Sequence, residues 1–177
     1  MLVKKSDLKI ISNTSPILNQ PTRPYDFEKD GATAPMFANV LFSIMQEEGG
    51  VGIAANQVGI PVSVFVMGYD NKKFFIFNPV VLASSEKEIS YEEGCLSFPG
   101  MGVKVDRPES IDVQYQNERG EVIITSFKGL AARIFQHEYD HTLGITMKKK
   151  VSTLKWALAE KKRSKNQKLR ALYKNNS

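Results

Sequence analysis

The sequence predicts an α+β fold, in which antiparallel strands pack around a central helix that carries a His-Glu-x-x-His motif, with a basic helix at the C-terminus. Three observations support this class. Apolar residues recur with helical spacing in two segments that end at glycine, residues 34–48 and 129–143. Between these segments lie short apolar runs that are typical of strands. Lysine and arginine then dominate residues 148–177.

Three segments have the spacing of an amphipathic helix, and we expect helices at residues 34–48, 129–143 and 153–173. The first segment stops at Gly49-Gly50 and the second at Gly144, and glycine is the residue most often found just past a helix end. In the third segment, Leu154, Trp156, Leu158 and Leu169 are expected to pack on the body of the protein, with the lysines outward.

Several short runs have the composition of strands, and we expect strands at residues 62–67, 73–77, 80–82, 111–116 and 122–127. The last two alternate apolar and polar residues on either side of Asn117-Glu118-Arg119-Gly120, which predicts a hairpin. Residues 8–31 are rich in Pro, Asn and Asp, so we expect a loop-rich lead-in.

The motif His137-Glu138-Tyr139-Asp140-His141 contains both histidines of the chain. Positions i and i+4 share one face of a helix, so both imidazoles can point at one metal ion. Glu138 lies beside that ion without having to bind it, and can take a proton from a water molecule. The single cysteine, Cys95, can complete three protein ligands and leave a fourth position open. The pattern predicts a zinc- or iron-type hydrolase site.

The composition indicates how the chain is organised and in which compartment the site works. A length of 177 residues, with 42% hydrophobic and 24% charged residues, predicts a single catalytic domain over residues 1–177, with a core at about 34–147. No apolar run is long enough to span a bilayer, and the first residues lack the apolar stretch of a signal peptide. One cysteine cannot form an internal disulfide, which fits a cytoplasmic protein, although an organellar or viral origin stays open.

Charge is distributed unevenly along the chain. Residues 148–177 hold 11 of the 24 Lys and Arg residues and one of the 19 acidic residues, Glu160, which gives them a net charge of +10. The remaining 13 basic and 18 acidic residues give residues 1–147 a net charge of −5. This asymmetry is compatible with a polyanionic partner for the basic tail, and equally with a well-solvated terminal helix.

A glycine-rich segment, Gly50-Val51-Gly52-Ile53-Ala54-Ala55-Asn56-Gln57, precedes the predicted strands and lacks the signature of a phosphate loop. Together with Glu93-Gly94-Cys95-Leu96-Ser97 and Gln136-His137-Glu138-Tyr139-Asp140-His141, it resembles the three motifs of the peptide deformylases, in the family's order and with similar spacing. The resemblance extends from about residue 36 to residue 144. It implies hydrolytic removal of the N-formyl group from nascent polypeptides, which releases formate.

The resemblance also implies roles for individual residues. Cys95, His137 and His141 correspond to the metal ligands, and the metal implied is Fe²⁺ in the cell, with Zn²⁺, Ni²⁺ or Co²⁺ able to use the same ligands. Glu138 corresponds to the general base and acid. The side-chain amide of Gln57 and the backbone N–H of Leu96 correspond to the donors that stabilise the oxyanion.

Substrate contacts are implied less directly. The backbone at Val51, Gly52 and Gly94 can pair with an extended peptide as an added strand. The residues expected to line the pocket for the methionine side chain are Tyr91, Leu130 and Ile134. The glycine-rich stretch Phe98-Pro99-Gly100-Met101-Gly102 is expected to leave the rim of the cleft less basic than in relatives with an arginine there. Arg107 is expected to pair with Glu93 and so hold the cysteine loop.

The expected partners are formyl-Met nascent peptides, with a ribosome contact through the basic tail, no membrane, and a monomeric state. Two other hypotheses are less well supported. In a zinc endopeptidase, Glu160, 19 residues after His141, would be a third ligand, but lysines surround it and Cys95 and Gln57 would have no role. A catalytically idle RNA-binding protein would not need the complete set of site residues.

Overall fold

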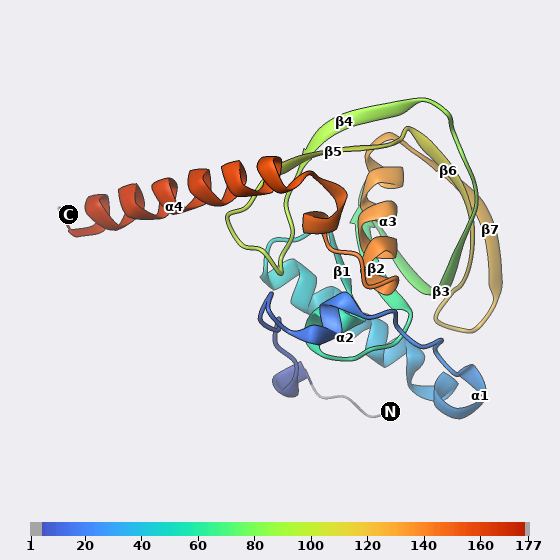
Figure 1. The fold of residues 1–177 in the computed structure, drawn as a ribbon. Helices are drawn as coiled ribbons and strands as arrows, with labels where there is room; N and C mark the ends of the chain where they lie inside the picture. Colours follow the sequence, from blue (N-terminus) through green and yellow to red (C-terminus); the bar gives the residue numbers. More distant parts are fainter. Residues whose placement is uncertain (1–4, 176–177) are drawn as a thin grey trace.

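The structure, a computed structural model, describes residues 5–175, with side chains to residue 169. Five antiparallel strands form one sheet in the order β1-β2-β3-β6-β7, and β4 pairs with β5 in a second sheet (Figure 1). The strands are β1 (Gly52–Ala54), β2 (Val64–Tyr69), β3 (Lys72–Ser84), β4 (Glu88–Glu93), β5 (Val103–Pro108), β6 (Ser110–Gln116) and β7 (Val122–Lys128). The helices are α1 (Phe27–Asp30), α2 (Ala34–Glu47), α3 (Gly129–Thr142) and α4 (Thr153–Asn175), with 3-10 turns η1 (Lys5–Asp7), η2 (Pro16–Asn19), η3 (Gly31–Thr33), η4 (Ala55–Val58) and η5 (Met147–Lys150).

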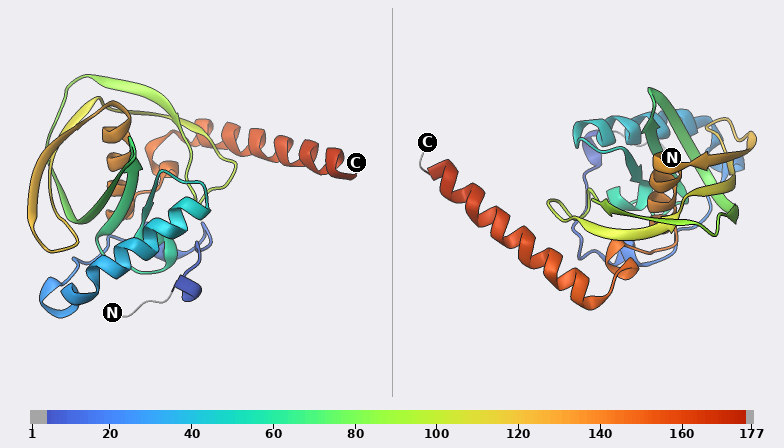
Figure 2. Two further views of the ribbon diagram at one scale, coloured as in Figure 1. Left: turned by 180° about the vertical axis from the view of Figure 1, so that it is seen from behind. Right: turned by 90° about the horizontal axis from the view of Figure 1, so that it is seen from above.

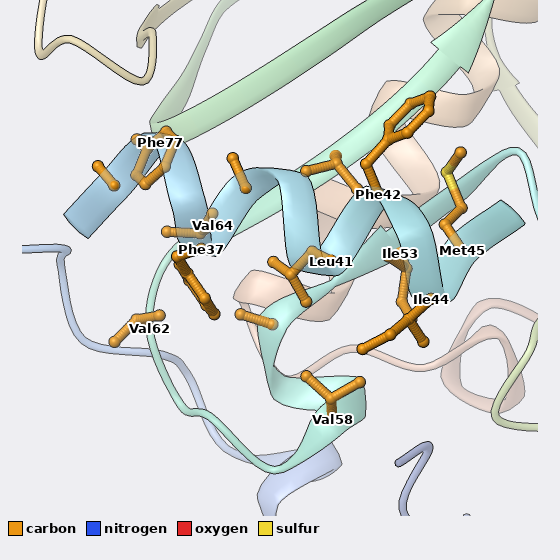
Figure 3. Close-up of a cluster of buried hydrophobic side chains, with 14 of the residues drawn as sticks. Phe37, Leu41, Phe42, Ile44, Met45, Ile53, Val58, Val62, Val64 and Phe77 are labelled. Carbon is orange, nitrogen blue, oxygen red and sulfur yellow. The ribbon is translucent and has the colours of Figure 1, made fainter. Parts of the chain in front are cut away.

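Helices α2 and α3 pack on opposite faces of the larger sheet. Val64 and Val66 of β2 join the cluster under α2, in which Phe37 and Leu41 point at the sheet (Figure 3). The alternate residues of β2, Phe65 and Met67, join the cluster under α3. Residues 64–67 are therefore buried on both faces, which explains why this strand reads as a continuous apolar run.

The helix predictions agree with the structure to within one or two residues at most ends. Helix α3 ends at Thr142, and Gly144 follows with a φ of +69°, which residues other than glycine rarely adopt. A Cβ at Gly144 would also lie 2.5 Å from the backbone carbon of Gln20, so the lead-in packs directly on the end of α3. The expected hairpin is confirmed, because β6 pairs with β7 across the turn that contains Gly120.

The strand predictions need three corrections. Residues 73–77 and 80–82 belong to one strand, β3, with a shift of register between Phe77 and Val80. Strand β1, which is only three residues long, was not predicted. The β4–β5 hairpin was not predicted, because β4 has the sequence Glu-Ile-Ser-Tyr-Glu-Glu and is exposed except at Glu93. An exposed strand lacks the apolar alternation on which such a prediction depends.

Helix α4 begins on the body and then projects away from it (Figure 2). Trp156 is buried and stacks edge-on against Phe98, with ring centroids 5.3 Å apart. The expectation that three leucines also pack on the body is wrong, because Leu154, Leu158 and Leu169 are exposed by 71%, 59% and 42%. Among the described side chains of α4, Trp156 and Ala159 contact the core cluster, and helical spacing places the three leucines on other faces of the helix. Within the described residues, none of the helices has the length and apolar character needed to cross a membrane.

Candidate active site

Helix α3 and the loop after β4 bring three metal-ligating side chains together. His137 and His141 project from one face of α3, with ring centroids 5.1 Å apart. The Sγ of Cys95 lies 3.3 Å from Nε2 of His141. One ligand atom from each of the three residues lies within 4.8 Å of the others, so a single ion can contact all three. One sulfur and two nitrogens suit a first-row transition metal with an open fourth position.

The protonation of the two histidines differs. Burial lowers the pKa of His141 well below its usual value, so this ring stays neutral and offers a lone pair. Burial has the same tendency at His137, but hydrogen bonds with Cys95 and Glu93 outweigh it and raise its pKa to about 10. A metal ion must displace this proton, so protons and metal compete for the site.

A buried carboxylate orients His137. Glu93 Oε2 accepts from Nδ1 of His137 at 3.0 Å, which leaves Nε2 for a metal. The guanidinium of Arg107 binds Glu93 through two hydrogen bonds of 2.6 and 2.9 Å, so the expected pair is confirmed. Burial alone would raise the pKa of Glu93, but hydrogen bonds from His137 and Arg107 hold it at about 2. Arg107 also binds Asp140 at 2.8 Å, which connects the β4–β5 hairpin to α3.

Arg133 is a further member of this network that sequence analysis did not identify. It donates from Nη1 to Glu93 at 2.6 Å and to the carbonyl of Val105 at 3.0 Å. Its guanidinium also lies over the ring of Tyr91, 5.7 Å from the centroid. Arg133 precedes His137 by one helical turn and therefore lies on the same face of α3, a spacing that could have identified it.

Glu138 is buried beside the ligand cluster, with 4% of its surface exposed. Its Oε2 meets no hydrogen-bond partner among the described residues. Burial raises the pKa of Glu138 to about 7, against the opposing positive charges of His137 and Arg107. A carboxylate with a pKa near neutrality can both accept and return a proton. Gly52 leaves the room that this side chain needs, since a Cβ there would lie 2.8 Å from Cγ of Glu138.

Gln57 presents its amide N–H groups to the same cavity. Its Oε1 accepts from the backbone N–H of Ala54 at 2.8 Å, which fixes the orientation of the amide. Nε2 then donates to Oγ of Ser97 at 3.0 Å and lies 3.5 Å from Sγ of Cys95. In the described part of the chain, the N–H of Leu96 donates to no protein acceptor, so it is available to another group. Ser97, which supports Gln57, was not identified from the sequence.

A cavity of about 520 Å³ is lined by Gln57, Cys95, Leu96, His137 and Glu138. One wall is the segment that contains Val51 and Gly52, and the opposite wall is the end of β4 with Gly94. Both walls are sheet edges, because among the residues that the structure describes β1 pairs only with β2 and β4 only with β5. The gap between two free edges has the geometry for an extended peptide.

The residues expected to form the methionine pocket also line this cavity. Ile134 is buried, whereas Leu130 and Tyr91 are 53% and 60% exposed. The alternative ligand Glu160 is exposed on α4 and does not belong to the ligand cluster. The expectation of a less basic rim is incomplete, because Arg163 of α4 lies against Gly100. A residue so distant in the chain cannot be placed at this rim from local sequence patterns.

The fold and the cluster of a cysteine sulfur and two imidazoles beside a buried carboxylate are those of a metal-dependent hydrolase. The family model for polypeptide deformylases matches residues 7–156. The chain belongs to the peptide deformylase family. It removes the N-formyl group from N-formylmethionyl nascent peptides and releases formate.

Individual comparisons agree with this family. The peptide deformylase of Thermotoga maritima is 42% identical over 122 residues, which cover 69% of this chain and 74% of the relative. The crystal structure of the peptide deformylase from Thermotoga maritima matches with a TM-score of 0.78 and 36% identity, and covers 82% of this chain and 97% of its own. A Met-Ala-Ser-bound structure of a class I type b peptide deformylase from Acinetobacter baumannii matches with a TM-score of 0.77 and 31% identity, over 81% and 98% of the two chains.

Proposed function

We propose that Cys95, His137 and His141 hold one divalent cation, Fe²⁺ in the cell, and that Zn²⁺, Ni²⁺ or Co²⁺ can occupy the same ligands. The observation that carries this proposal is the approach of the three ligand atoms to within 4.8 Å beside a buried carboxylate. When bound, the cation lowers the pKa of its water and polarises the formyl carbonyl. The hydrogen bond from His137 to Glu93 supports the proposal, because carboxylates commonly orient metal-bound histidines.

Glu138 acts as the proton carrier in this proposal. Its unpartnered Oε2 takes a proton from the attacking water and then gives it to the departing amine of methionine. The pKa of about 7 that burial produces suits both steps, since neither protonation state is strongly favoured near neutral pH.

Gln57 and Leu96 stabilise the negative charge that develops on the formyl oxygen. Nε2 of Gln57 is held as a donor because its Oε1 is occupied by Ala54. The N–H of Leu96 follows a metal ligand and has no acceptor among the described residues. The loss of one donor of this kind lowers kcat by about 10²–10³-fold.

The peptide lies as an extended strand between the edges of β1 and β4, paired with the backbone at Val51, Gly52 and Gly94. Its methionine side chain enters the part of the cavity lined by Tyr91, Leu130 and Ile134. The related Acinetobacter baumannii enzyme has been crystallised with Met-Ala-Ser bound, which supports a peptide of this length as the ligand.

The test is formate release from formyl-Met-Ala-Ser by protein purified without oxygen, together with analysis of its metal content. We expect one formate per peptide, loss of activity on chelation, and recovery when Fe²⁺, Ni²⁺ or Zn²⁺ is added to the protein. The acetyl-Met-Ala-Ser peptide is the matched control, because only its acyl group differs. Cleavage of a peptide bond, or formate release that resists a chelator, would contradict the proposal.

We further propose that the enzyme acts in the cytoplasm as a monomer and that α4 contacts the ribosome. Lys161, Lys165 and Lys168 are exposed, and helical spacing places them opposite the buried Trp156. This face offers positive charge to RNA phosphate near the point where nascent chains emerge. The exposed Leu158 lies on the same side and adds apolar surface to the contact.

Co-sedimentation with ribosomes at two salt concentrations tests this contact. The variant in which Lys161, Lys165 and Lys168 are all changed to Glu should bind more weakly, and its log–log salt slope should be smaller by about 2–3. A truncation from residue 161 is a poorer choice, because it also removes Lys162 and Arg163 from the rim of the cleft. Unchanged binding of the triple variant, or no binding of the wild type at low salt, would contradict the proposed ribosome contact.

A further inference from the structure

A second cavity of about 490 Å³ adjoins the catalytic cleft. Its inner wall consists of residues that also line the catalytic cavity, namely Tyr91, Glu92, Gly94, Gly100 and Met101. Its outer wall is one face of α4, with Ala159, Lys162, Arg163 and Asn166. Because the two cavities share these lining residues, they lie next to each other at the end of β4.

Packing holds this face of α4 in place. Trp156 and Ala159 join a core cluster with Phe98 and Met101, which belong to the loop that follows Cys95. The stem of Arg163 continues this contact, since a Cβ at Gly100 would lie 3.8 Å from its Cγ. The helix is therefore anchored to the cysteine loop itself, and Arg163 follows directly after the anchored turns.

Arg163 carries a charge that the protein does not neutralise. Its Nε is buried and meets no acceptor, and none of the ion pairs found among the described residues involves it. The two acidic residues of the shared wall are already engaged. Glu93 is bound by Arg107 and Arg133, and Glu92 lies 3.9 Å from Nζ of Lys162.

We propose that this second cavity is a subsite for the nascent chain beyond its first residues, and that Arg163 selects an acidic side chain there. The inference rests on the proposed placement of the peptide between β1 and β4. A carboxylate suits the cavity because a guanidinium binds it through charge-assisted hydrogen bonds. The helix α4 would then supply a specificity residue to the active site, in addition to any contact that its outer face makes.

A panel of formyl peptides tests the subsite. In formyl-Met-Ala-Ala-Ala-Ala-amide, each of positions three to five is replaced in turn by Glu or by Gln, and the C-terminal amide removes the free carboxylate. We expect kcat/KM of the wild-type enzyme to be about two- to fivefold higher for Glu than for Gln at one of these positions, through KM, as for a partly exposed charge pair.

Two variants assign the preference to Arg163. In Arg163→Gln, the ratio of kcat/KM for the Glu and Gln peptides should fall to about 1. Lys161→Gln is the matched control, because it removes one positive charge from the opposite face of α4. This variant should keep the ratio of the wild type. Glu92→Gln should raise the ratio, since it frees Lys162 and removes a competing carboxylate.

The outcomes separate this inference from the proposed function. Equal rates for the Glu and Gln peptides in the wild type would overturn the subsite. So would an equal loss of the preference in Arg163→Gln and Lys161→Gln, which would show a general effect of the basic helix. Failure of the wild type to deformylate the all-alanine peptide would contradict the proposed function instead.

Discussion

Helices α3 and α4 both have apolar residues at helical spacing and both carry a glutamate that fits a metalloprotease-like pattern, but their surroundings differ. Glu138 of α3 is 4% exposed, and burial raises its pKa to about 7. Glu160 of α4 is exposed among lysines. The comparison teaches that the spacing of residues predicts a helix, whereas the chemistry of a carboxylate depends on what packs around it.

Basic residues show the same contrast between the two helices. Arg133 of α3 is largely buried and binds Glu93 and two backbone carbonyls. On α4, Lys161 and Lys165 are exposed and have no partner among the ion pairs of the described residues. The charges of α3 therefore organise a site inside the protein, while most of those of α4 are available to partners outside it.

The largest expected effect comes from removing a ligand. Cys95→Ala or His141→Ala should lose bound metal and activity together, with affinity falling by more than the 10–100-fold that is typical of residues that only orient a ligand. Glu160→Ala should change neither quantity. Metal analysis and formate release on the three purified variants check this. Loss of metal in Glu160→Ala with retention in Cys95→Ala would place the third ligand on α4 and not in the loop after β4.

A methyl group at Gly52 should displace Glu138 without touching a ligand. In Gly52→Ala the new Cβ would lie 2.8 Å from Cγ of Glu138, so the carboxylate must move. We expect kcat/KM to fall by about 10²-fold, the usual effect of a displacement of about 1 Å at a reacting group, while metal is retained. The control is Gly31→Ala, whose Cβ meets only Phe27 at 3.5 Å or more. Normal kinetics of Gly52→Ala would show that Glu138 does not need its present position.

The buried and the exposed apolar residues of α4 should contribute differently to the free energy of unfolding. Trp156→Ala removes a buried ring from its contact with Phe98 and should lower the free energy of unfolding by about 3–5 kcal/mol. Leu158→Ala, at a side chain that is 59% exposed, should change it by less than about 0.5 kcal/mol. Urea denaturation of the two variants measures the difference. Equal losses would mean that the exposed leucine packs on the body after all.

The network that holds α3 to the cysteine loop should make stability sensitive to acid. The pKa of Glu93 falls from 4.5 to about 2 on folding, so Glu93 stabilises the folded state fully above about pH 4.5. That contribution should be lost as the pH falls toward 2, because the folded state must then also bind the proton. The free energy of unfolding should therefore decline less steeply over this range in Glu93→Gln than in the wild type. Parallel curves would exclude Glu93 as a source of the decline.

Much of this account was accessible from the sequence, because it depends on local patterns. The spacing of His137 and His141 predicted their common face, and motif context brought Cys95 and Gln57 to the same site. The pairing of Arg107 with Glu93 was also predicted. These residues lie within or beside segments whose periodicity or glycine content is readable along the chain.

The remainder depends on contacts between distant segments. Strand β4 has no apolar alternation in the sequence, because its side chains are exposed except at Glu93. Arg163 reaches the rim only because Trp156 anchors α4 on Phe98. The exposed leucines of α4 were predicted to be buried because periodicity identifies an apolar face but not the surface that covers it.

The most direct test of the account is the turnover number for formyl-Met-Ala-Ser of metal-loaded Glu138→Gln, measured beside metal-loaded Glu160→Gln. The two substitutions are chemically identical and differ only in the helix that carries them. The account predicts that Glu138→Gln keeps its metal and loses about 10²–10⁴-fold in kcat, the size of a general acid–base contribution, while Glu160→Gln matches the wild type. Near-normal turnover of Glu138→Gln with its metal retained would contradict the account.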